Sequence, residues 1–195
     1  NGKVTPVFVY TDYPEAELFV NGVSQGRQRK LTREEFLASS DTLAMQRRYR
    51  LMWNNVIYQP GELKVVAYDA SGKAVAEEIV RTAGKPHHLV ATVNRNKLKA
   101  DGEDLAYITV TVVDKNGIPC PADTRMVKFK VTGAGSFRAA ANGDATCTEL
   151  FHNPRMPLFS GALTAIVQSS DTAGEIVFEA GAKGVKGARL VLKSE

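Results

Sequence analysis

The amino-acid sequence predicts an all-β protein made of two tandem immunoglobulin-like β-sandwich domains. Its 195 residues are about twice the ~100 residues of one such sandwich. Short β-branched and aromatic segments with alternating apolar and polar residues recur along the chain, and turns containing Gly, Asn and Asp separate them. A parallel sheet would need helical segments between its strands, and the sequence has no helical pattern of ordinary length.

The clearest strand and turn lie near the N-terminus. Residues 15–20 alternate Ala, Leu and Val on one side with Glu, Glu and Phe on the other, which is the period of a half-buried strand. Asn21 and Gly22 follow, and both residue types accept the positive φ of a two-residue hairpin turn. The same criteria predict further strands in the first half at residues 5–10, 23–26, 49–53, 63–68 and 74–82.

The strand pattern is interrupted between residues 30 and 46. Thr32 and Glu35 have the spacing of a capping box, in which two side chains bond free N–H groups at the start of a helix. Apolar Phe36 and Leu37 follow them. We therefore expect a short helix or turn inserted between two strands.

The best candidate for a domain boundary is the turn-forming segment Ala83-Gly84-Lys85-Pro86, which has no apolar periodicity. It predicts one sandwich over residues 1–84 and a second over residues 85–195. Strands of the second sandwich are predicted at residues 88–93, 105–114, 127–132, 136–140, 163–169, 175–180 and 188–192.

Trp53 is the one tryptophan of the chain. On the predicted strand it shares a face with Tyr49 and Leu51, which favours a core anchor of the first sandwich, as large aromatics often are in such domains. A sugar-stacking platform is the alternative for Trp53.

The formal net charge is +4, and basic residues concentrate in one region: Arg27, Arg29, Lys30, Arg33, Arg47, Arg48 and Arg50. Nucleic-acid binding would need stacking aromatics among them or a recognition helix. Neither is evident, so we expect a solvent-exposed flank and no nucleic-acid partner. The longest apolar run, residues 108–113, is far shorter than the ~20 residues that span a bilayer, and no membrane insertion is expected.

Cysteine and metal-ligating residues are sparse. Cys120 and Cys147 permit one disulfide without implying it. The carboxylates at positions 101, 103 and 104 match no calcium-binding loop, and a turn is the better interpretation. The three histidines have no metal spacing, so neither a metal nor another cofactor is predicted.

A family resemblance is carried by residues in both halves. Glu17-Leu18-Phe19-Val20-Asn21-Gly22, Tyr49-x-Leu51-x-Trp53 and Pro60-Gly61-Glu62-Leu63 resemble the immunoglobulin-like domain that follows the catalytic barrel in family-2 glycoside hydrolases. Asp101-Gly102-x-Asp104-Leu105 and Val127-x-Phe129-x-Val131-Thr132-Gly133 resemble the companion module of these enzymes, itself similar to invasin-type repeats. Two departures are the length of residues 30–46 and the presence of Cys147.

The resemblance implies a place in a larger enzyme. Family-2 enzymes use two glutamates on a barrel, and a barrel needs ~250 residues, more than this chain contains. The chain begins at Asn1 without an initiator methionine or a signal-peptide pattern, as expected of a fragment or processed chain. We expect non-catalytic scaffold domains that pack on the barrel of a secreted or periplasmic bacterial enzyme of the β-galactosidase type. The alternatives are a carbohydrate-binding module and an adhesin-type repeat.

One candidate contact site is the long polar and aromatic segment 141–161, because long loops in compact domains are often functional. The hypothesis pairs Arg155 with Asp144 or Glu149 and places Phe151 and Phe159 beneath them. Self-packing is one role for this loop, and contact with sugar or with a neighbouring domain is the other. Its candidate residues are Asn142, Asp144, Glu149, Phe151, Arg155 and Phe159.

Overall fold

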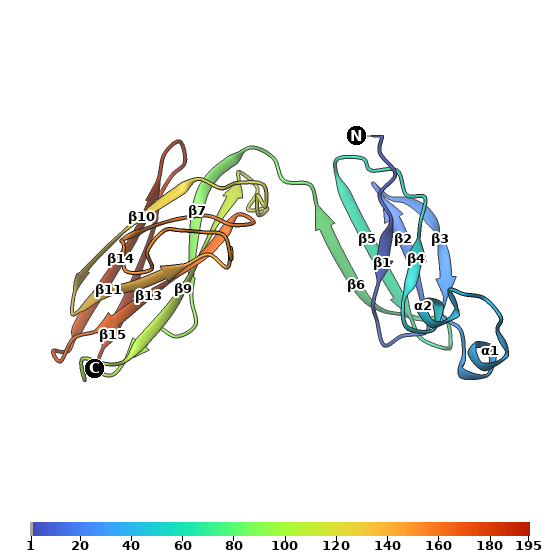
Figure 1. Ribbon diagram of the computed structural model, residues 1–195, viewed down its shortest axis with the longest axis horizontal. Helices are drawn as coiled ribbons and strands as arrows, with labels where there is room; N and C mark the ends of the chain where they lie inside the picture. Colours follow the sequence, from blue (N-terminus) through green and yellow to red (C-terminus); the bar gives the residue numbers. More distant parts are fainter. Residues whose placement is uncertain (1) are drawn as a thin grey trace. The chain divides into compact units, whose positions relative to one another are not determined.

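The computed structural model describes residues 2–195 and confirms the all-β sandwich fold class. The chain divides into two compact units between Thr82 and Ala83 (Figure 1). This division lies two residues before the boundary drawn from the sequence. None of the helices in the described residues is long and apolar enough to cross a membrane.

The first unit has a four-stranded and a two-stranded antiparallel sheet. The order β3-β2-β5-β6 makes up the larger sheet, and β1 pairs with β4 in the smaller one. The bounds are β1 Val7–Val9, β2 Glu15–Val20, β3 Val23–Arg29, β4 Leu51–Trp53, β5 Glu62–Tyr68 and β6 Ala74–Arg81.

The hairpin turn between β2 and β3 is confirmed. Asn21 has φ 49° and Gly22 has φ 80°, and Val20 lies opposite Val23, as in a two-residue turn. The Asn21 side chain also accepts a hydrogen bond from the backbone N–H of Glu62 at 2.7 Å. The turn residue therefore also holds the start of β5 against the hairpin.

Two short helices occupy the insertion, α1 at Arg33–Ala38 and α2 at Ala44–Tyr49. The capping box is confirmed, since Thr32 accepts from the Glu35 N–H and the Glu35 side chain accepts from the Thr32 N–H. The predicted strand start at Tyr49 is wrong. Tyr49 is the last residue of α2 and 62% exposed, because the Arg50 N–H still donates to the carbonyl of Gln46.

The core of the first unit is small and lies between β2 and the β1–β4 pair. Trp53 is 5% exposed, and its indole N–H donates to the carbonyl of Gly26 at 3.0 Å. This bond satisfies the polar edge of the ring while its apolar body is buried. The buried cluster consists of Ala16, Leu18, Val20, Leu51, Trp53 and Val56.

The second unit is a sandwich of a five-stranded and a four-stranded sheet, with orders β12-β10-β14-β15-β8 and β11-β13-β9-β7. The short strands β8 and β12 were not predicted, because two or three residues are too few to show an alternating pattern. The bounds are β7 Pro86–Val93, β8 Lys97–Leu98, β9 Leu105–Asp114, β10 Met126–Gly133, β11 Gly135–Ala141, β12 Arg155–Pro157, β13 Ala162–Ser169, β14 Gly174–Ala182 and β15 Ala188–Ser194.

Aromatic and aliphatic side chains fill the space between these two sheets. Phe178 is fully buried and stacks on Phe129, with ring centroids 5.9 Å apart. Phe129 stacks in turn on Phe137 at 5.4 Å. Alternation on β9 and β13 buries every second residue, so both strands contribute one complete face to this core.

The buried carboxylate of Asp114 ties the first residues of the second unit to its sheet. It accepts from the N–H groups of Gly84 at 2.8 Å, Asn116 at 2.8 Å and Ile118 at 2.9 Å. These backbone donors, led by Gly84, lower the pKa of Asp114. Ala83 also packs against the core of this unit.

These contacts predict where the chain can be cut. We expect fragments 1–82 and 83–195 each to fold, and fragment 86–195 to melt at a lower temperature than 83–195, because it lacks Ala83 and the Gly84 donor. Circular dichroism melts measure this difference. If fragments 1–82 and 83–195 are both unfolded while the full chain unfolds cooperatively, the two units do not fold independently and the prediction is wrong.

Candidate functional site

The polar side chains at the start of the 141–161 segment form hydrogen bonds to other residues of the same segment. The Asn142 side chain donates to the carbonyl of Pro157 at 3.0 Å and accepts from the Asp144 N–H at 3.0 Å. Asp144 accepts from the hydroxyl and the N–H of Thr146, and these bonds lower its pKa. Both side chains therefore hold the loop in shape.

Arg155 pairs with Glu149, one of the two partners predicted for it, at 3.3 Å. Glu149 also accepts from the side-chain amide of Asn153 at 2.5 Å. The Asn153 bond, followed by Arg155, lowers the pKa of the Glu149 carboxyl. Asp144 does not join this pair.

The predicted position of the two phenylalanines is wrong. Phe151 is 65% exposed and Phe159 is 45% exposed, whereas Met156 and Leu158 are buried. The reason is the short strand β12, which pairs with β10, so that its alternation turns Met156 inward. The segment thus presents two aromatic rings to solvent.

The structure also places the two cysteines and the acidic turn at residues 101–104. Cys120 and Cys147 are both free thiols, and burial raises the pKa of Cys120. Asp101 accepts from the N–H groups of Glu103 and Asp104, which is turn chemistry. Residues 2–195 contain no cluster of three side chains able to hold a metal ion.

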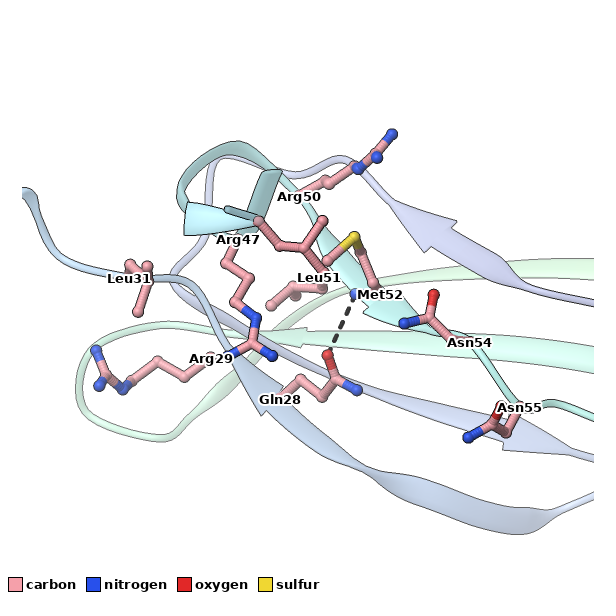
Figure 2. A pocket seen from close by; sticks show the side chains of 10 residues that line it. Gln28, Arg29, Leu31, Arg47, Arg50, Leu51, Met52, Asn54 and Asn55 are labelled. Carbon is pink, nitrogen blue, oxygen red and sulfur yellow. Dashed lines mark hydrogen bonds between the residues drawn. The ribbon is translucent and has the colours of Figure 1, made fainter. Parts of the chain in front are cut away.

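A pocket of about 480 Å³ lies in the first unit, where the insertion meets β3 and β4 (Figure 2). Sequence reasoning missed it. The concentration of basic residues was the available signal, but the lining comes from segments that are separate in the sequence. It is lined by Gln28, Arg29, Leu31, Leu43, Arg47, Arg50, Leu51, Met52, Asn54 and Asn55.

Two of the three arginines that line this pocket use the terminal nitrogens of their guanidinium groups in hydrogen bonds outside it. Arg29 forms a two-pronged ion pair with Glu35, and this pair, with the capping bond to Thr32, lowers the pKa of Glu35 to about 2. Arg50 donates to the Tyr10 hydroxyl and to the side chain of Gln46. Figure 2 shows both guanidinium groups pointing away from the centre.

Arg47 is the arginine whose guanidinium points into the pocket (Figure 2). Its Nε lies 3.4 Å from a carboxylate oxygen of Asp41. Gln28 lies opposite, and its side-chain oxygen accepts from the backbone N–H of Met52 at 3.2 Å. The pocket therefore presents the terminal nitrogens of Arg47, whose Nε is paired with the Asp41 carboxylate, together with neutral amides and apolar walls.

Comparison with known proteins decides the family. The model of the glycoside hydrolase family 2 C-terminal domain 5 matches residues 89–191, more than half of the chain, and a domain of unknown function (DUF4982) matches residues 2–76. The chain belongs to glycoside hydrolase family 2, as its C-terminal region. The predicted resemblance is thereby confirmed.

The family-2 relatives are much longer than this chain. A β-galactosidase of Bacteroides ovatus (BoGH2A) is 36% identical over 186 residues, which are 95% of this chain and 20% of that protein. A β-galactosidase of Thermoanaerobacter pseudethanolicus is 33% identical over 109 residues, 56% of this chain and 13% of that protein. The chain thus spans about a fifth or less of these relatives.

A solved family-2 structure shares the fold of the whole chain. The family-2 member from Bacteroides cellulosilyticus superposes with a TM-score of 0.88 at 28% identity, over 100% of this chain and 23% of that one. The fold of each unit is therefore found within a longer family-2 protein.

Proposed function

We propose that this family-2 region is a non-catalytic scaffold that packs on the catalytic barrel of a β-galactosidase-type enzyme and stabilises it. The match to one fifth of a β-galactosidase over nearly the full chain carries this proposal. A barrel needs ~250 residues, more than the 195 present, so the two catalytic carboxylates belong to another part of the enzyme. Catalytic domains of the same polypeptide are the partner.

The purified chain is expected to show no turnover of an aryl β-galactoside, because neither unit supplies a barrel with a carboxylate pair. Release of the aryl alcohol measures turnover, and a full-length family-2 β-galactosidase is the positive control. Turnover by the chain that a point substitution within it abolishes would overturn the non-catalytic role.

The exposed rings of Phe151 and Phe159 are apolar surface that the 141–161 segment offers to a partner. Contact with the barrel is the leading assignment, and contact with sugar is the second candidate. Hydrogen exchange distinguishes them. Protection of this segment by the remainder of the enzyme supports the first assignment, and protection by oligosaccharide alone supports the second.

We also propose that the enzyme works outside the cytoplasm, secreted or in the periplasm. An enzyme placed there would reach glycosides that are too large to cross a bilayer unaided. Fractionation of the source bacterium tests this proposal, and recovery of the enzyme in the cytosolic fraction would contradict it.

A further inference from the structure

The side-chain amide of Gln28 has a defined direction in the pocket of the first unit. Its oxygen is engaged with the N–H of Met52, which leaves the amide nitrogen as the free end. Within residues 2–195, no hydrogen-bond acceptor is assigned to this nitrogen. Gln28 therefore offers a donor whose orientation a backbone contact sets in advance, which reduces the entropic cost of binding.

Arg47 supplies two further N–H donors beside this amide, at the terminal nitrogens of its guanidinium. Its contact with Asp41 uses Nε, and the two terminal nitrogens of its guanidinium have no partner among the residues described. In Figure 2 its guanidinium points toward Gln28. Terminal guanidinium nitrogens are well suited to bind a carboxylate through two parallel hydrogen bonds.

Two further amides line the pocket at the end of β4. Asn54 and Asn55 directly follow Trp53, and their exposed side chains have no assigned hydrogen bond in the described chain. An amide both donates and accepts, which matches the hydroxyl groups of a sugar. Leu43 and Met52 add apolar surface for the C–H face of a ring.

We propose that this pocket binds an acidic saccharide unit, a uronate, with its carboxylate on Arg47 and Gln28 and its hydroxyls on Asn54 and Asn55. The volume of about 480 Å³ lies within the ~300–1,000 Å³ of small-molecule sites. This binding activity goes beyond the scaffold role and does not depend on it, because the pocket is formed by the first unit alone.

The test is titration of the purified chain with di-galacturonate, followed by the side-chain amide signals in NMR and by calorimetry. The substitution Gln28→Glu retains an oxygen for the Met52 N–H but places a negative charge beside the carboxylate. We expect Gln28→Glu and Arg47→Ala each to weaken binding about ten- to a hundredfold, the size of a charged hydrogen bond.

Arg33→Ala is the matched control, because it removes the same charge from an exposed position of α1 that does not line the pocket. We expect its affinity to equal that of the unchanged chain, and circular dichroism verifies that all variants fold. Equal binding of neutral lactose and di-galacturonate would overturn the proposal. So would the absence of binding, or an affinity that neither Gln28→Glu nor Arg47→Ala alters.

Uronate binding and the scaffold role are tested independently. Binding is measured on the isolated chain, so the expected affinities stay the same even if the chain does not stabilise a barrel. Conversely, a chain that binds no uronate can still stabilise a barrel.

Discussion

Replacing Trp53 with Ala is expected to destabilise the first unit by about 3 to 5 kcal/mol, the usual cost of deleting a large buried aromatic. The side chain is 5% exposed and packs in the small cluster with Leu18 and Leu51. The substitution also removes the donor to the carbonyl of Gly26. Because few buried side chains surround Trp53, they cannot move far enough to fill the cavity that the substitution leaves.

Denaturant unfolding followed by circular dichroism measures the loss, since the variant has no other tryptophan for fluorescence. Tyr49→Ala is the matched control. This aromatic is only four residues away but is 62% exposed, so its loss is expected to stay within about 0.5 kcal/mol. A loss below about 1 kcal/mol for Trp53→Ala would exclude the core role and favour the sugar-stacking alternative.

Gly133→Ala is expected to destabilise the second unit by roughly 3 kcal/mol or more, from backbone strain and overpacking together. Gly133 has φ +94°, and a Cβ there would lie 2.0 Å from the carbonyl oxygen of Glu175. That oxygen belongs to the backbone of the neighbouring strand and already accepts from the Ala134 N–H. Relief of the clash therefore requires β10 and β14 to move apart.

The substitution Gly143→Ala is the control that distinguishes backbone strain from the steric clash at Gly133. Gly143 has a similar φ of +80°, but nothing lies within 4 Å of its added Cβ. We expect a clearly smaller loss of unfolding free energy for Gly143→Ala in the same denaturant titration. Equal losses for the two variants would show that the left-handed backbone conformation alone, without the contact to Glu175, accounts for the effect.

The candidate site shows how far local patterns reach. The charges in this short segment predicted that Arg155 pairs with Asp144 or Glu149, and the structure selects Glu149. The burial of Phe151 and Phe159 was predicted wrongly, because hydrophobicity alone does not say which residues of an irregular segment face the core. The pairing of β12 with β10 decides that, and three residues are too few to reveal it.

The sequence by itself determined most of the longer strands, the hairpin at Asn21 and Gly22 and the helix start at Thr32, and its motifs in both halves indicated the family. The strands, the hairpin and the helix start depend on residues close together in the chain, whose periodicity or φ preference acts locally. Only the tertiary structure decided the pocket around Arg47. Gln28, Arg47 and Asn54 come from β3, α2 and the end of β4, and pairing and packing between these segments, rather than any local preference, bring their side chains together.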